Sequence, residues 1–134
     1  MTRRQFREHV FKILFSLDFY PAEEAEEQID NYLLQDEIKM TDEEKQEVRD
    51  RVNNLLQKLA DIDARLEEIS EGWSLKRMGG AERGILRNAV YEICFSEDTP
   101  DKVAVNEAVE LAKKYCGDEG PVFVNGVLAK LMKD

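Results

Sequence analysis

The sequence predicts an all-α protein, folded as a single domain over residues 1–134 with about seven helices. Three observations favour this class. Apolar residues recur at spacings of three and four along most of the chain, which is the period of a helix with one buried face. Helix-start signals stand ahead of these runs, including a capping box at Thr41–Glu44 and a proline, Pro121, at the entry to the last run. No long stretch alternates apolar and polar residues as a half-exposed strand would.

Residues 3–19 form the first expected helix. Its apolar residues fall on one stripe, consisting of Phe6, Val10, Ile13, Leu14 and Leu17. Four other residues fall well away from that stripe: Arg4, Glu8, Lys12 and Phe15. An aromatic side chain on the polar side of a helix either packs under another helix or serves as an exposed anchor for a partner, and both alternatives stay open for Phe15.

The remaining helices follow from similar patterns. An acidic helix is expected around Ile29 and Leu33, and a long helix runs from the capping box through Leu59. Asp61 or Asp63 then restarts a helix that closes at Glu71-Gly72. A connector leads to a helix over residues 81–95. A helix containing Asn106 and a last helix after Gly120-Pro121 complete the chain.

Charge is distributed unevenly along the chain. The net charge is −10, yet residues 1–20 carry +2 while residues 21–50 carry −9. Fields at a protein surface are screened over about 8–10 Å, so the local charge decides what a surface binds. A basic end on an acidic protein can hold RNA, and the acidic face would then discourage indiscriminate binding. The acidic face is explained equally well as a solvated surface that keeps the protein soluble.

The residue types exclude most catalytic sites. His9 is the single histidine and has no cysteine nearby, so it is expected at the surface or its boundary and not as a ligand or base. Asp61-x-Asp63 lacks the glycine and distal acid of a calcium loop, and Gly79-Gly80 lacks phosphate-loop spacing. Cys94 and Cys116 are expected as reduced thiols. With no membrane-spanning run of roughly 18 apolar residues and no signal peptide, we expect a cytoplasmic binding protein that is not an enzyme.

Three blocks of the sequence resemble the NusB family of transcription antitermination factors. The family's C-terminal signature reads roughly V-x-I-N-E-A-x-E-L-A-K…F-V-N-G-V-L. It is matched here by Val103, Val105, Asn106, Glu107, Ala108, Glu110, Leu111, Ala112 and Lys113, then Phe123, Val124, Asn125, Gly126, Val127 and Leu128. Trp73 followed by Glu82 to Glu92 resembles the central block, and the first turn R-R-x-x-R-E is matched by Arg3, Arg4, Arg7 and Glu8. Residues 21–60 match only in being helical and acidic.

The resemblance implies a NusB-like fold of two small helical bundles packed together, without a metal or cofactor. It implies binding of the boxA RNA element of ribosomal RNA leader transcripts as a heterodimer with the ribosomal small-subunit protein NusE. Within the RNA polymerase antitermination complex, that heterodimer prevents early termination. By matching position, the RNA contacts would be Arg3, Arg4, Arg7, Lys12, Arg87, Glu119, Phe123 and Asn125. The NusE contacts would include Phe15 and Glu82.

Some positions depart from the family's pattern, and some alternatives stay open. Phe15 stands where tyrosine is common and Lys12 where glutamine is common, which removes a hydroxyl and adds a charge. Asn125 either reads a base edge or caps the preceding turn, whereas Asn106 is expected to be structural. Two other functions remain. The chain could be a homodimeric interaction module, or a stand-alone relative of the RNA-binding domain attached to an RNA cytosine methyltransferase.

Overall fold

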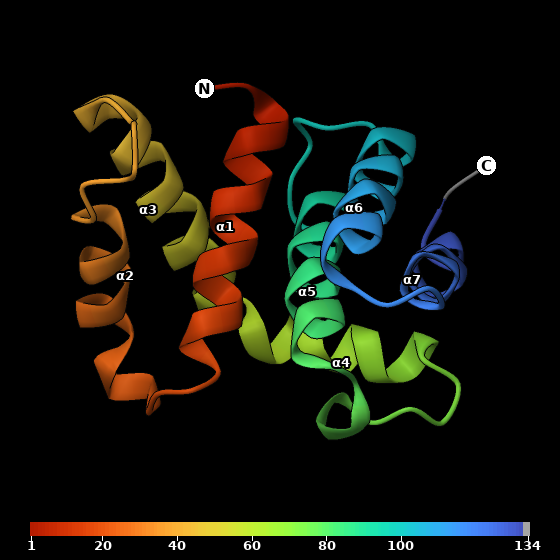
Figure 1. The fold of residues 1–134 in the computed structure, drawn as a ribbon. Coiled ribbons are helices and arrows are strands. Elements are labelled where there is room, and N and C mark those ends of the chain that lie inside the picture. The colour runs from red at the N-terminus through yellow and green to blue at the C-terminus, as the bar shows by residue number, and fades with distance from the viewer. Residues whose placement is uncertain (133–134) are drawn as a thin grey trace. The chain divides into compact units, whose positions relative to one another are not determined.

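The computed structural model describes residues 1–132, in which seven α-helices and two short 3-10 turns account for all regular secondary structure (Figure 1). Within this part there is no strand, so the predicted all-α class is confirmed. The chain divides into a first unit, residues 1–56, and a second unit from residue 57 onward. The expectation of a single domain stays a prediction. Among the described residues, no helix is both long and apolar enough to cross a membrane.

The first unit contains α1 (Arg3–Leu17), a 3-10 turn (Ala22–Glu24), α2 (Ala25–Leu33) and α3 (Asp42–Gln57). Capping boxes start both long helices. Thr41 and Glu44 exchange two hydrogen bonds of 2.9 and 3.1 Å, as predicted. Thr2 and Gln5 exchange bonds of 2.8 and 3.0 Å ahead of α1, a box that the sequence reading missed. Each box satisfies backbone N–H groups that a helix start leaves unpaired.

Helix α1 is two residues shorter than predicted. It ends at Leu17, and the amide groups of Phe19 and Tyr20 bond the carbonyls of Ser16 and Leu17 in a tighter turn. Pro21 explains the stop, because a proline disfavours the helical conformation at the residue before it. The predicted stripe is otherwise correct, since its first four members are buried and Leu17 is half-buried.

Polar contacts connect all three helices of the first unit. His9 Nδ1 on α1 shares a 2.7 Å hydrogen bond with the Tyr32 hydroxyl on α2. Arg49 on α3 donates to Asp30 on α2 at 2.6 Å. The predicted boundary position of His9 is confirmed, because its side chain is half-buried. Burial, and then the charge of Lys12, lower the pKa of His9.

This lowered pKa predicts a pH dependence of stability. A histidine that resists protonation in the folded state favours unfolding in acid, so the free energy of unfolding should rise as pH increases through about 6.5. We expect the melting temperature to rise from pH 5.5 to pH 7.5, and to rise less in His9→Gln. Because the chain has one histidine, the difference between the two proteins isolates its contribution. Identical pH profiles would contradict the prediction.

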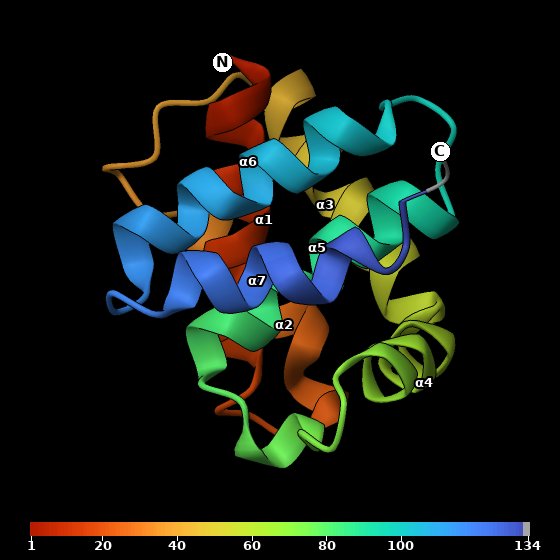
Figure 2. The same ribbon diagram turned by 90° about the vertical axis from the view of Figure 1, so that its right-hand side faces the viewer.

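The second unit contains α4 (Leu59–Ile69), a 3-10 turn (Leu75–Arg77), α5 (Gly80–Cys94), α6 (Asp101–Tyr115) and α7 (Gly120–Ala129). Helix α5 contacts α4, α6 and α7, and the last two lie side by side (Figure 2). Its apolar residues at helical spacing are all buried: Ile85, Leu86, Ala89, Val90 and Ile93. Gly84 is also buried within α5.

The boundary between α3 and α4 differs from the prediction. Helix α3 ends at Gln57 instead of continuing through Leu59, and α4 begins at Leu59 instead of at Asp61 or Asp63. Lys58 forms the turn between them, with its carbonyl accepting from the Ile62 amide at 2.9 Å. Neither glycine nor proline marks this turn, so the usual sequence signal for a break is absent.

Two glycines of α7 occupy opposite environments. A Cβ atom added at Gly120 would lie 2.3 Å from the Cβ of Cys116, closer than such atoms approach in real proteins. A Cβ added at Gly126 would meet nothing within 4 Å. Only Gly120 is therefore required for the turn from α6 into α7 to close.

These two positions form a matched pair of substitutions. Gly120→Ala should lower the free energy of unfolding by about 1–3 kcal/mol, because the chain must shift to relieve the overlap. Gly126→Ala should raise it by up to about 1 kcal/mol through helix propensity alone. Chemical denaturation measures both. If Gly120→Ala left the free energy of unfolding unchanged, α6 and α7 would be less tightly joined than this contact requires.

Candidate nucleic-acid interface

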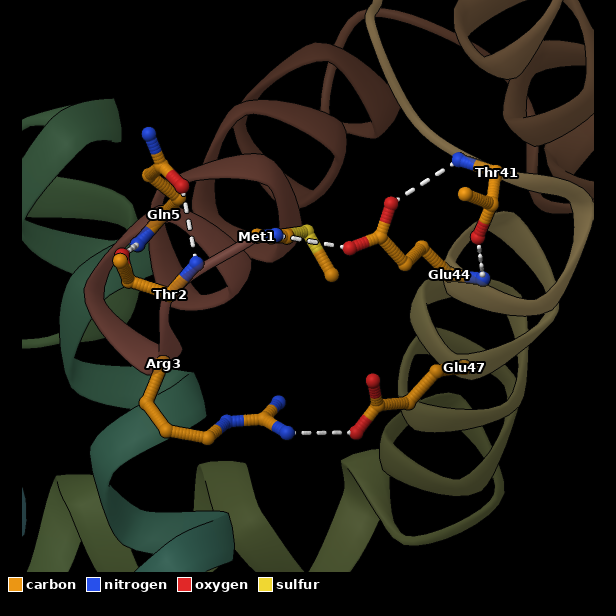
Figure 3. Close-up of polar contacts among 7 residues, drawn as sticks. All are labelled: Met1, Thr2, Arg3, Gln5, Thr41, Glu44 and Glu47. Atoms are coloured by element: carbon orange, nitrogen blue, oxygen red, sulfur yellow. Dashed lines mark hydrogen bonds and ion pairs between the residues drawn. The ribbon is translucent and has the colours of Figure 1, made fainter.

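Exposed cations lie along α1. Arg3, Arg4 and Lys12 are all exposed, as a phosphate-binding surface requires. Arg3 is held from two sides. Its Nη1 atom donates to Glu47 Oε2 on α3 at 2.7 Å (Figure 3). Its guanidinium also lies 4.1 Å from the centre of the Phe6 ring. Stacking on an aromatic ring and pairing with a carboxylate fix a guanidinium in place. The three exposed cations of α1, Arg3, Arg4 and Lys12, are called the basic arm below.

Arg7, also predicted to contact RNA, is buried, unlike the other cations of α1. Its side chain is only 7% exposed, and no buried side-chain polar atom among the described residues lacks a hydrogen-bond partner. A buried guanidinium whose hydrogen bonds are satisfied within the protein cannot reach a phosphate without breaking them. This position argues against direct RNA contact by Arg7 and favours a role in holding α1.

The exposure of Phe15 favours the partner-anchor alternative over packing beneath another helix. Its side chain is 37% exposed and lies edge-on to Phe19, with ring centres 5.5 Å apart. Phe19 is 72% exposed and Tyr20 is 44% exposed. These three residues form an exposed aromatic patch, which the sequence reading anticipated only at Phe15. The spacing of four between Phe11, Phe15 and Phe19 was the available signal.

A hollow in the second unit brings together three of the predicted site residues. Glu119 and Phe123, predicted for RNA, and Glu82, predicted for the partner, all line it. Its volume is about 250 Å³, and its other lining residues are Trp73, Arg77, Met78, Gly79 and Gly120. The rings of Trp73 and Phe123 meet edge to face with centres 6.0 Å apart. We call this feature the aromatic hollow.

The chemistry of the aromatic hollow suits a planar group with polar edges. Trp73 and Phe123 offer ring surfaces for stacking, while Arg77 can donate and Glu82 and Glu119 can accept hydrogen bonds. Trp73 and Arg77 were not predicted as site residues. Trp73 belongs to the central sequence block, which was a usable signal, whereas nothing in the sequence singled out Arg77.

Arg83 braces one wall of this hollow. Its Nη1 atom donates to the backbone carbonyls of Leu75 at 2.7 Å and Met78 at 3.3 Å. These bonds join the 3-10 turn that carries Arg77 to helix α5. These bonds add to the packing of the connector, whose Leu75 and Met78 side chains are buried.

Glu82 has a second contact beneath the hollow. Burial, and then the charge of Glu82 and a hydrogen bond with it, raise the pKa of the Cys116 thiol to about 12. The thiol therefore stays protonated in neutral solution and donates to the carboxylate. Only the remaining hydrogen-bonding capacity of Glu82 is available to a ligand.

Two further predicted RNA residues differ in availability. Arg87 forms a two-point ion pair with Asp63, at 2.9 and 3.0 Å, and its side chain is only 13% exposed. Such a pair joins α4 to α5 and leaves little of the guanidinium for RNA. Asn125 lies exposed within α7, so it does not cap the preceding turn. Asn106 is exposed as well, on α6.

Among the described residues, no group of three or more His, Cys, Asp or Glu side chains could hold a metal ion.

Comparisons with known proteins agree with this arrangement. The sequence model of the NusB family matches residues 4–133. The chain belongs to the NusB family. It is 49% identical to transcription antitermination protein NusB of Agathobacter rectalis, over 97% of this chain and 98% of that protein. It is 46% identical to the protein of the same name from Lachnoclostridium phytofermentans, over 98% and 99% of the two chains.

Solved structures of NusB proteins share the fold. T. maritima NusB matches with a TM-score of 0.87 and 34% identity, over 98% of this chain and 90% of that one. A crystal structure of antitermination factors NusB and NusE in complex with dsRNA matches with a TM-score of 0.82 and 27% identity, covering 98% and 97%. The predicted family and fold are therefore confirmed.

The contact between Cys116 and Glu82 predicts low thiol reactivity. In a Cys94→Ala background, Cys116 should react with iodoacetamide at pH 8 far more slowly than an unfolded chain, because alkylation requires the thiolate. Glu82→Gln should accelerate labelling by lowering the pKa of the thiol. Glu97→Gln, in an exposed loop, is the control for loss of one negative charge. Equal rates in folded and unfolded protein would contradict the contact.

Proposed function

We propose that this chain is a transcription antitermination factor that binds boxA RNA of ribosomal RNA leader transcripts together with NusE. In that role it keeps RNA polymerase from terminating early. The observation that carries the proposal is the end-to-end similarity to transcription antitermination proteins, at 49% identity over 97% of this chain. It is supported by the fold shared with the NusB of a complex containing NusE and RNA.

The proposed RNA contacts divide between two kinds of surface. The basic arm supplies Arg3, Arg4 and Lys12, whose charges suit backbone phosphates. The aromatic hollow supplies Phe123 with Glu119 at its rim, and Asn125 lies exposed on the same helix. A base stacked on an aromatic side chain contributes about 1–3 kcal/mol, so a single-stranded element would gain most from this hollow. Arg7 and Arg87 act from within the protein, by holding helices in place.

The proposed NusE surface is the exposed aromatic patch around Phe15. Aromatic side chains concentrate binding energy at protein interfaces when they become fully desolvated. The exposed rings of Phe19 and Tyr20 extend the patch beyond Phe15. Glu82, in the second unit, is proposed as a separate NusE contact, with the hydrogen-bonding capacity that Cys116 leaves available.

The patch also favours a second candidate function. An exposed apolar surface of this kind could equally be covered by a second copy of the chain, which would make the protein a homodimeric interaction module. Under either function we propose a binding protein of the cytoplasm and not an enzyme.

The test is binding of a short boxA-type single-stranded RNA at two salt concentrations, with and without NusE. We expect tighter binding with NusE and weaker binding in high salt. Lys12→Ala should weaken binding and reduce the salt slope by about 0.7, the value for one phosphate on a single strand. Lys39→Ala, an exposed lysine of the acidic segment, is its control.

A second pair of variants tests the aromatic hollow. Phe123→Ala should lower RNA affinity by about 1–3 kcal/mol, whereas Val122→Ala, 77% exposed on the same helix, should change it little. A double-stranded RNA serves as the competitor that lacks unstacked bases. Absence of RNA binding with and without NusE, together with a stable homodimer in solution, would favour the interaction module instead.

A further inference from the structure

The ion pair between Arg3 and Glu47 places a carboxylate on a group proposed to bind phosphate. Arg3 Nη1 and Glu47 Oε2 are 2.7 Å apart (Figure 3). Carboxylates and phosphates satisfy the same guanidinium donors, so the two anions compete for them. Glu47 therefore occupies donors of Arg3 that an RNA phosphate would use.

The surroundings of the pair keep both charges in position. The Arg3 guanidinium lies over the ring of Phe6, which is only 2% exposed and therefore fixed by packing. Glu47 projects from α3, whose start is fixed by the capping box of Thr41 and Glu44. Glu44 also accepts from the amino group of Met1 at 2.8 Å, a second bond between the same two parts of the unit. The carboxylate is thus held beside Arg3 and does not have to be recruited.

Exposure makes this contact displaceable. The side chains of Arg3 and Glu47 are 58% and 47% exposed, so water and salt weaken their attraction. A buried pair would hold Arg3 permanently, as Asp63 holds Arg87 at 13% exposure. An exposed pair instead subtracts a small, constant amount from the binding free energy of any ligand that displaces Glu47 from Arg3.

We propose that Glu47 is an intramolecular competitor of RNA, which occupies Arg3 and sets a threshold for binding. This inference rests on the proposed RNA-binding function and adds regulation to its basic arm. The competitor lowers the affinity for every RNA by a similar factor. RNA held only through its backbone is weakly bound from the start. Its dissociation constant is therefore the first to exceed the working concentration of RNA. An RNA that also stacks its bases retains enough affinity to displace the carboxylate.

The test compares two substitutions that remove the same charge from the same helix. Glu47→Gln should raise the affinity for boxA-type RNA and for a base-scrambled RNA by about two- to fivefold, the range expected for losing one exposed ion pair. Glu43→Gln is the control, because Glu43 is exposed on α3 and forms no ion pair in the described part of the chain. Its effect measures the long-range contribution of one negative charge.

A double-mutant cycle assigns the effect to Arg3. In an Arg3→Ala background, Glu47→Gln should raise RNA affinity no more than Glu43→Gln does, since the contested group is gone. Melting temperatures establish that all variants fold. If the wild-type protein binds RNA but Glu47→Gln and Glu43→Gln change RNA affinity by the same factor, the competitor role is overturned. If the wild-type protein binds no RNA with or without NusE, the proposed function itself fails.

Discussion

Burial of α5 on most of its faces is the constraint on which the second unit depends. Eight of its fifteen residues are buried, including Gly84 and the polar Asn88 and Glu92. A helix buried to this extent must be surrounded, and α4, α6 and α7 all contact it. The aromatic hollow follows from that packing, because α5 contributes Glu82 while α7 contributes Phe123. Gly120 permits the approach, since any larger residue would collide with Cys116.

The two long helices of the first unit differ in how their first-turn charges interact with the helix dipole. The first turn of α1 contains no acidic residue, whereas the first turn of α3 contains Asp42, Glu43 and Glu44. Acids at a helix start interact favourably with the helix dipole and cations do not, so α3 is stabilised and α1 is not. Bonds from α3 to Met1 and Arg3 compensate α1 for its unfavourable charges. Glu44 and Glu47 thereby pair with two cations at the start of the chain.

Local patterns predicted the helices well because the determinants of a helix lie within a few residues of one another. The Thr41 box, the buried stripe of α1 and the entry of α7 all follow from such patterns. The break at Lys58 was missed because no glycine or proline marks it in the sequence. The site was predicted less completely. Arg77 reaches the aromatic hollow only through the course of its connector, and the contact of Cys116 with Glu82 joins two helices.

The arginines show why a matching motif identifies positions more reliably than roles. Arg3 is 58% exposed, Arg87 is 13% exposed and Arg7 is 7% exposed, although all three match positions of one family pattern. The exposure of an arginine decides whether it binds an anion of the protein or an anion of a ligand. A buried guanidinium is committed to protein partners by the cost of leaving any charge unpaired there, while an exposed one exchanges partners easily. The pattern thus contains both arginines committed to partners within the protein and an arginine exposed to solvent, and only the fold separates the two groups.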